Sequence, residues 1–323
     1  MADTVLLRVQ DLTVEYHTRL GVLTAVDKIT LDIQRGEVLG LVGESGCGKS
    51  TLGRALLRMI QPPGRITSGR LVFDGTDLMG LSPRQMRDLR GRRISMIFQD
   101  PMTSLNPVQR IVDHVVETIR THRRDVNRAA AEARAAELAD RLGILASRLT
   151  DHPHQFSGGM RQRVMIELAL ALNADLVIAD EATTSLDVLV EAQFLDLMRE
   201  LREEFSLTIL MITHNIGVVA ELADRVAVMY AGQLIELADV YDLFAEPLHP
   251  YTQSLLAAVP NIKLLDDQLF KLSGSPPNLL APPAGCRFHP RCPQVMDRCL
   301  TEQPPYREVR PGCCTACWLY EDD

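Results

Sequence analysis

The sequence predicts an α/β fold, in which a covered parallel sheet carries an inserted helical subdomain and ends in a small cysteine-containing extension. Three observations predict it: short apolar runs alternate with helical patterns, the composition turns helical over about 101–173, and proline-rich segments after residue 246 bracket six of the seven cysteines. We therefore expect an α/β domain over 1–245 and a loop-rich extension over 246–323.

The first elements follow from hydrophobic periodicity. Apolar and polar residues alternate over 6–9 and 29–33, which predicts a small sheet. A continuous apolar run over 38–42 enters a glycine-rich turn, and helical periodicity follows over 50–57.

Further strands are expected where apolar runs return after the helical segment. These runs lie at 176–179, 207–212 and 226–229, with helical patterns between them. Such alternation is typical of a covered parallel sheet.

Composition excludes several classes of protein. With 323 residues, 46% of them hydrophobic, the chain can bury a large core, and its formal net charge of -8 argues against a protein that coats nucleic acid. No stretch has the roughly 18 to 20 uninterrupted apolar residues of a membrane helix, and the N-terminus does not resemble a secretory signal. We therefore expect a soluble or peripheral protein in the cytosol.

The glycine-rich turn carries a phosphate-binding pattern. Residues 43–50 read GESGCGKS, which fits G-x-x-x-x-G-K-S between a predicted strand and a predicted helix. Backbone N–H groups would surround phosphate oxygens, Lys49 would contact the β- and γ-phosphates, and Ser50 would bind Mg²⁺. An incidental glycine-rich turn is the alternative, which the flanking elements disfavour. The residues expected to bind ATP here are Gly43, Glu44, Ser45, Gly46, Cys47, Gly48, Lys49, Ser50 and Thr51.

Two carboxylates follow the apolar run over 176–179, at the strand end where α/β sheets place their ligands. In this Walker B arrangement Asp180 would hold Mg²⁺ through water, and Glu181 would orient and polarise the attacking water. Taken alone, such a pair is more often a helix cap with a first-turn acid, so the assignment depends on the phosphate loop.

Two other polar residues end predicted strands. His214 follows the strand over 207–212 and would sense the γ-phosphate and stabilise the transition state. Gln99 closes the run over 94–98 and would bind Mg²⁺ or the attacking water. A structural histidine and a loop glutamine are the alternatives.

Three further strings resemble the ABC ATPases. Residues 156–163, FSGGMRQR, resemble the family's signature, Ser185-Leu186-Asp187 resemble its D-loop, and Thr213-His214 its switch histidine. The motifs together cover about residues 5 to 240. The resemblance implies a P-loop NTPase with a RecA-like core, in which ATP is bound between two nucleotide-binding domains arranged head to tail.

The resemblance also implies how the site is completed. Ser157 with the amides of Gly158 and Gly159 would bind the γ-phosphate of ATP held by the partner's phosphate loop, although a serine helix cap uses the same N–H groups. Tyr16 matches the aromatic that stacks on adenine, a surface-strand tyrosine being the alternative. Asp187 belongs to the D-loop and joins the nucleotide-binding set.

The chain departs from the family pattern at two positions. Ala182 stands where relatives usually carry proline, and Met160 replaces the commoner glutamine. Glu181 is present, so neither departure implies loss of hydrolysis.

The C-terminal strings LHPYTQSLL (248–256) and GCRFHPRCP (285–293) resemble the extension of dipeptide and oligopeptide importer ATPases. The string DPMTSLNP (100–107) is expected to meet membrane subunits. The implied function is to energise uptake of di- and oligopeptides, at the cytoplasmic face of the membrane. Nickel and glutathione importers share the extension, so the substrate stays open.

The resemblance also implies partners. These are a second ABC ATPase subunit that is related but not identical, two membrane-spanning permease subunits and an extracytoplasmic substrate-binding protein, with no nucleic acid.

The clustered cysteines suggest a metal, since a reducing cytosol disfavours disulfides. Four thiolates could bind zinc or an iron–sulfur cluster. The spacing is wider than the paired C-x-x-C of zinc ribbons, and the resemblance implies a 4Fe-4S cluster bound by Cys286, Cys292, Cys299 and Cys317. Free thiols remain the alternative.

Two other functions compete with import. Soluble ABC ATPases of DNA repair or translation generally carry two cassettes or a long coiled-coil insertion, whereas this chain shows one cassette with a short helical insert. A regulatory cassette that binds ATP without hydrolysing it is disfavoured by Glu181 and His214. We expect hydrolysis in a dimer and weak activity at best in the isolated chain.

Overall fold

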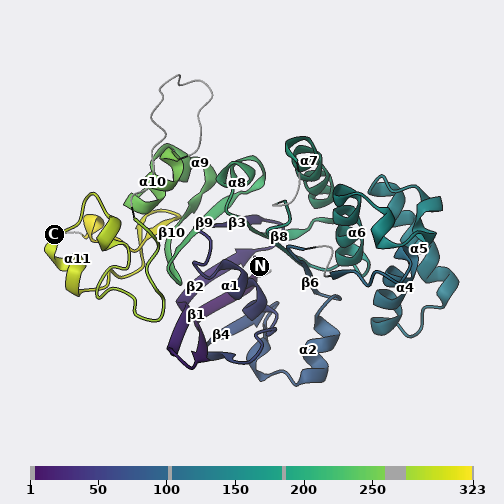
Figure 1. Cartoon of the computed structure of the whole chain (residues 1–323), viewed down its shortest axis with the longest axis horizontal. Coiled ribbons are helices and arrows are strands. Elements are labelled where there is room, and N and C mark those ends of the chain that lie inside the picture. Colours follow the sequence, from purple (N-terminus) through teal and green to yellow (C-terminus); the bar gives the residue numbers. More distant parts are fainter. Residues whose placement is uncertain (1–3, 101–103, 184–186, 259–273, 322–323) are drawn as a thin grey trace. The chain divides into compact units, whose positions relative to one another are not determined.

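The computed structural model describes residues 4–100, 104–183, 187–258 and 274–321 (Figure 1). The chain divides into two compact units, residues 1–79 with 212–323 and residues 80–211. Each unit is described by itself.

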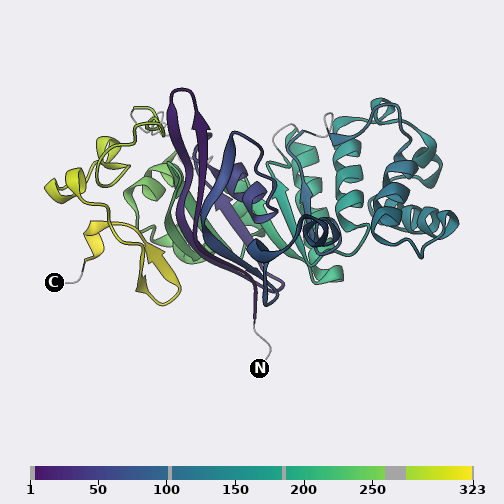
Figure 2. The same cartoon turned by 90° about the horizontal axis from the view of Figure 1, so that it is seen from below.

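The first unit contains an antiparallel sheet in the order β2-β1-β4-β5. The predicted segments 6–9 and 29–33 do pair, with Leu7 opposite Ile33 and Val9 opposite Leu31, but the strands are much longer than predicted, as the hairpin in Figure 2 shows. Their buried positions include Leu7, Val9 and Ile33, which explains the alternation. The strands are β1 (Val5–Thr18), β2 (Gly21–Gln34), β4 (Gly64–Phe73) and β5 (Thr76–Asp77).

A second sheet in the same unit has the order β11-β12-β10-β9-β3. β3 pairs with β9 in parallel, and every residue of β3 is buried, as its continuous apolar run predicts. The others pair antiparallel. The strands are β3 (Val38–Val42), β9 (Arg225–Tyr230), β10 (Gln233–Asp239), β11 (Arg307–Arg310) and β12 (Cys313–Thr315).

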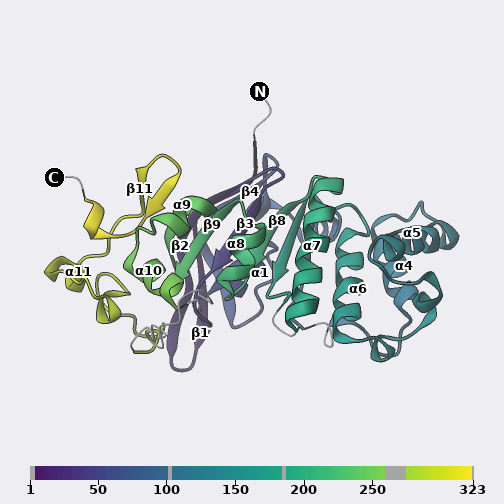
Figure 3. The same ribbon diagram turned by 90° about the horizontal axis from the view of Figure 1, so that it is seen from above.

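Short helices complete the first unit. α8 packs directly on β3, because a Cβ added to Gly40 would lie 2.4 Å from Cγ1 of Val219, and Figure 3 shows the two side by side. The helices are α1 (Lys49–Leu56), α8 (Ile216–Leu222), α9 (Val240–Ala245), α10 (Pro250–Ala257) and α11 (Asp297–Thr301), with 3-10 turns η4 (His289–Arg291) and η5 (Trp318–Tyr320).

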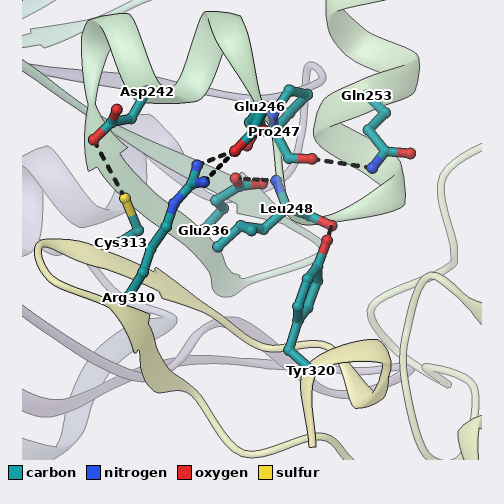
Figure 4. A network of polar contacts seen from close by, with 9 residues as sticks. All are labelled: Glu236, Asp242, Glu246, Pro247, Leu248, Gln253, Arg310, Cys313 and Tyr320. Atoms are coloured by element: carbon teal, nitrogen blue, oxygen red, sulfur yellow. Dashed lines mark hydrogen bonds and ion pairs between the residues drawn. The ribbon is translucent and has the colours of Figure 1, made fainter.

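The C-terminal extension is attached to β10, and contacts within the extension hold the segment before α10 (Figure 4). The buried carboxylate of Glu236 accepts the backbone N–H groups of Leu248 at 2.6 Å and His249 at 2.9 Å. The hydroxyl of Tyr320 donates to the carbonyl of Leu248 at 2.9 Å, and Arg310 binds Glu246. The extension thus adds β11 and β12 to a sheet of the first unit instead of forming loops alone.

The second unit holds a parallel pair of strands and most of the long helices. β6 (Ile94–Ile97) pairs with β7 (Leu176–Asp180), and β8 (Thr208–Ile212), which the unit boundary crosses near its end, follows β7 in the strand order. The helices are α2 (Pro83–Leu89), α4 (Ile111–His122), α5 (Arg128–Arg141), α6 (Gly158–Leu170) and α7 (Val188–Phe205), with 3-10 turns η1 (Leu78–Gly80) at the unit boundary, η2 (Ala146–Thr150) and η3 (Pro153–Gln155).

Helices α4, α5 and α6 contact one another and fall within the interval expected to be helical. α5 begins after Asn127, whose side chain accepts the N–H of Ala130, a typical N-cap. Among the described residues, no helix is both long and apolar enough to cross a lipid bilayer.

Candidate nucleotide site and cysteine cavity

The phosphate loop connects β3 to α1 in the first unit. Gly43, Gly46 and Gly48 have φ of 152°, 80° and 108°, a region that residues with a Cβ rarely adopt. A Cβ would lie 2.2 Å from the carbonyl oxygen of Met229 at Gly43 and 2.1 Å from that of Ala25 at Gly48. Gly43 and Gly48 are therefore required for two reasons: their φ values are positive, and neighbouring backbone atoms leave no room for a Cβ.

Lys49 begins α1, with its ammonium directed back at the loop. Nζ donates to the carbonyl oxygens of Gly43 at 2.7 Å and Glu44 at 3.1 Å, and the residue is 4% exposed. The cation is thus held over the loop, where a phosphate would attract it. Burial raises the pKa of the Cys47 thiol, so this cysteine remains protonated.

The hydrolytic residues of the second unit come together at one edge of its sheet. Asp180 ends the buried strand β7, and Glu181 follows with a φ of +49°, where a residue with a side chain is strained. Nε2 of Gln99, beyond the end of β6, donates to Oε2 of Glu181 at 2.7 Å. Gln99 was expected near Mg²⁺ or water, and the structure adds this direct contact.

The signature residues begin α6. Oγ of Ser157 accepts the N–H of Met160 at 3.4 Å, so the expected helix cap is present. A Cβ on Gly159 would lie 2.7 Å from Cγ1 of Val190 on α7, whereas a Cβ on Gly158 would meet no described atom within 4 Å. Gly159 therefore serves the packing of α6 on α7, and Gly158 leaves open space at the helix start.

Three other expected residues have simple local surroundings. Asp187 caps α7, since its Oδ1 accepts the N–H of Val190 at 3.0 Å; Ser185 and Leu186 lie outside the described residues, as do residues 101–103. Tyr16 on β1 is half-buried, with its ring against Gly64. His214 is exposed beyond β8, and the N–H of the preceding Thr213 donates to the carbonyl of Leu41 at 3.1 Å.

Four cysteines of the extension line one small cavity, and they are the four predicted as ligands: Cys286, Cys292, Cys299 and Cys317. Cys313 and Cys314 lie on β12 and do not line it. Burial, with a smaller effect of neighbouring cysteines, raises the pKa of Cys286 to about 11 and that of Cys317 to about 12. These thiols therefore stay protonated unless a cation displaces their protons.

The four thiols of this cavity are the donors expected for the predicted iron–sulfur cluster. Across the described ranges, no three His, Cys, Asp or Glu side chains are placed to hold a single metal ion. A four-iron cluster takes one thiolate on each iron and so spreads its ligands more widely than one ion does. Four thiols around one cavity fit such a cluster in number and chemistry.

Two family models match separate stretches of the chain. A family model described as "ABC transporter" matches residues 26–184, and one described as "Oligopeptide/dipeptide transporter, C-terminal region" matches residues 235–299. The oligopeptide transport ATP-binding protein OppD of Bacillus subtilis is 43% identical, over 99% of this chain and 90% of that protein. The chain belongs to the ABC transporter ATP-binding proteins. Another relative, the dipeptide transport ATP-binding protein DppD of Escherichia coli, is 42% identical over 98% of each chain.

Solved ABC structures share the fold. The cassette MJ0796, in a dimeric post-hydrolysis state bound to ADP and Pi, has a TM-score of 0.65 and 25% identity, over 72% of this chain and 98% of that one. The structure of cbiO1 from Clostridium perfringens, part of the ABC transporter complex cbiONQ, has a TM-score of 0.65 and 28% identity, over 76% of this chain and 92% of that one. This ABC protein is accordingly an ATPase.

Two contacts of the phosphate loop in this ABC ATPase were not predicted. The carboxylate of Glu44 binds Arg291, and its N–H donates to the hydroxyl of Tyr251. Both partners lie in strings that the sequence had singled out, 248–256 and 285–293. Their place in these two strings was the signal that the sequence offered for the contacts.

Proposed function

We propose that this chain hydrolyses ATP to energise the uptake of di- and oligopeptides across the cytoplasmic membrane, as one subunit of an ABC importer. The observation that carries the proposal is similarity over nearly the whole chain to oligopeptide and dipeptide transport ATP-binding proteins. The match extends through the C-terminal region, at residues 235–299. Uptake of nickel or glutathione is the second candidate, based on the extension these importers share.

We propose that the ATP site is composed of the phosphate loop of one subunit and the signature of another. Residues 43–51 would bind the phosphates, and Tyr16 would stack on adenine. The surroundings of Gly158 support a site shared between two subunits. Because the space at its Cα is open, the first N–H groups of α6 are accessible to a phosphate bound by another chain. Asp187 would act beside this interface.

Hydrolysis is proposed to depend on the carboxylate of Glu181, which orients the attacking water and takes up its proton. As the water oxygen bonds to the γ-phosphorus, the bond from that phosphorus to the β–γ bridging oxygen breaks, and ADP leaves with the bridging oxygen. Gln99 supports this role, since its amide holds one carboxylate oxygen at 2.7 Å and fixes the orientation of the group. Ser50, Gln99 and Asp180 would hold Mg²⁺, which neutralises phosphate charge. His214 would donate to the γ-phosphate and stabilise the transition state.

The proposed domains are an ABC nucleotide-binding domain over 1–245, with a helical subdomain at about 101–173, and the extension over 246–323. The proposed partners are a second, related ABC ATPase subunit, two permease subunits and an extracytoplasmic binding protein. The chain would lie at the cytoplasmic face of the membrane, bound to the permeases.

We further propose that Cys286, Cys292, Cys299 and Cys317 hold a 4Fe-4S cluster. Their convergence on one cavity supports this set over one that includes Cys313 or Cys314. Chain purified without oxygen should be brown and contain about four irons. A colourless chain with stoichiometric zinc, or with no metal, would contradict it.

Uptake by a strain that lacks this chain tests the transport function. Labelled dipeptide, oligopeptide, nickel and glutathione are supplied in turn. We expect loss of peptide uptake, restored by the parent chain and not by Glu181→Gln. Loss of nickel or glutathione uptake alone would replace the proposed substrate, and unchanged uptake of all four would refute a role in import.

A further inference from the structure

Glu44, the second residue of the phosphate loop, makes polar contacts through its carbonyl, its N–H and its carboxylate. Its carbonyl accepts the ammonium of Lys49 at 3.1 Å. Its N–H donates to the hydroxyl of Tyr251 at 2.9 Å, and its carboxylate accepts two hydrogen bonds from Arg291. Two of the three contacts therefore come from the C-terminal extension, and the third is the lysine expected to bind the β- and γ-phosphates.

The contact between Arg291 and Glu44 has the geometry of a strong ion pair. The guanidinium nitrogens donate to Oε2 at 2.7 Å and to Oε1 at 2.9 Å, a bidentate arrangement that fixes the plane of the carboxylate. The side chain of Arg291 is 5% exposed and that of Glu44 27%. Because water is largely excluded from the arginine, this pair is more rigid than an exposed one.

Aromatic packing holds the Tyr251 hydroxyl in place. The rings of Tyr230 and Tyr251 lie 4.7 Å apart, and that of Phe288 lies 5.5 Å from Tyr251. Tyr251 and Phe288 are 0% and 1% exposed, and the hydroxyl of Tyr230 also accepts a hydrogen bond from Arg291 at 3.2 Å. One buried cluster thus orients both groups that contact Glu44.

Arg291 is joined through a tight turn to two cysteines of the cavity. The N–H of His289 donates to the carbonyl of Cys286 at 3.0 Å, and the N–H of Cys292 donates to the carbonyl of His289 at 3.2 Å. Arg291 lies inside this turn, next to Cys292. The backbone that carries Arg291 is therefore held by the hydrogen bonds of this turn.

We propose that Arg291 and Tyr251 are positioning residues for ATP binding, which hold Glu44 so that its carbonyl directs the Lys49 ammonium over the phosphate loop. The affinity of the chain for ATP then depends on the contacts of Arg291 and Tyr251 with Glu44. This inference rests on the proposed role of the phosphate loop and not on the transported substrate.

Binding of Mg-ATP to the full-length chain, measured by titration calorimetry, tests the proposal. We expect Arg291→Gln to raise Kd about tenfold, since a charge-assisted hydrogen-bonded pair is lost. Glu44→Gln should raise it by a similar factor, and the double variant by no more than either single change, because both remove one interaction. Arg291→Lys should recover part of the loss by restoring the charge without the bidentate contact.

Arg310→Gln is the matched control, because it removes another ion pair of the extension, to Glu246, with no contact to the phosphate loop. Its Kd should stay within about twofold of the parent. If Arg291→Gln does not fold, Tyr251→Phe keeps the aromatic packing, removes only the hydroxyl that accepts the Glu44 N–H, and should raise Kd about threefold.

Three results would overturn the inference. These are a Kd for Arg291→Gln within twofold of the parent, an equal rise for Arg310→Gln, and additive effects of the Arg291 and Glu44 changes. Failure of the proposed function is a separate result, since a parent chain that binds no ATP would refute the nucleotide site itself.

Discussion

Gln99 donates a hydrogen bond from Nε2 to Oε2 of Glu181 over 2.7 Å, although 82 residues separate the two in sequence. They meet because β6 and β7 are parallel neighbours, with Ile97 opposite Ala179, so the residues after each strand emerge at the same edge. The amide orients a carboxylate whose backbone is already in the left-handed region, at a φ of +49°.

Replacing Glu181 with glutamine should lower the turnover of ATP by a factor of about 10² to 10⁴, the range for loss of a general base. Binding of ATP should persist, because the phosphate loop is unchanged. Phosphate release and retention of labelled ATP by the assembled protein measure the two effects. Undiminished phosphate release would refute the assignment of Glu181.

Gln99→Ala should lower kcat about tenfold, because it frees the carboxylate of Glu181 and removes one of the proposed Mg²⁺ ligands while leaving the phosphate loop unchanged. Gln109→Ala is the matched control, since Nε2 of Gln109 donates to the carboxylate of Glu117 at 2.9 Å in the same unit, and not to that of Glu181. Steady-state ATPase assays compare them. Equal losses in both variants would show that the Gln99 contact is not specific to hydrolysis.

Alanine substitutions at the two adjacent glycines of the signature should affect different properties: ATPase activity at Gly158 and stability at Gly159. Gly158→Ala should fold with an unchanged melting temperature, because no described atom lies within 4 Å of the added methyl. It should lose ATPase activity, because the methyl would obstruct the proposed site for the nucleotide of another subunit. Gly159→Ala should lose about 1 to 3 kcal/mol of stability, since its methyl would overlap Val190. Calorimetric melting and ATPase assays distinguish the two, and the reverse pattern would contradict the proposed role of Gly158.

Glu167 on α6 should make stability fall with rising pH. Its side chain is fully buried, neither carboxylate oxygen has a hydrogen-bond partner among the described residues, and burial raises its pKa to about 8. The folded state therefore binds a proton that the unfolded state releases near its ordinary pKa of 4.5. From about pH 4.5 to 8 the free energy of unfolding should fall by up to roughly 1.4 kcal/mol per pH unit.

Replacing Glu167 with leucine should remove this pH dependence. Urea unfolding at pH 6 and pH 8 measures it: the parent should lose more stability between the two values than Glu167→Leu. All other titrating groups are common to both proteins, so the difference isolates Glu167. Parallel losses would show that the carboxyl is not protonated in the folded state.

Serine at any of the four cavity cysteines should remove most of the iron and the visible absorption, since each thiolate ligates one iron of the proposed cluster. Cys314→Ser should retain both, because Cys314 lies on β12, away from the cavity. Iron analysis and absorption spectra of anaerobic protein compare the variants. Loss of iron in Cys314→Ser alone would overturn the choice of ligands.

Several elements could be predicted from sequence because neighbouring residues determine them. The strand, glycine loop and helix around residues 43–50 follow from local periodicity and from the φ values that only glycine adopts readily. The runs over 176–179 and 226–229 became β7 and β9, each longer by one or two residues. Strands β10, β11 and β12 were missed, because they depend on pairing between distant segments.

The sequence by itself determined the phosphate loop, the Asp180–Glu181 pair and the signature, since each is a pattern of residue types at short spacing, whereas the set of four extension cysteines came from the family resemblance. Only the tertiary structure decided that Gln99 holds Glu181 and that Arg291, 247 residues after Glu44, binds the phosphate loop. It also decided which signature glycine is open, Gly158, and which is packed, Gly159. Those contacts arise where strand order and burial bring remote side chains together, and no local periodicity encodes them.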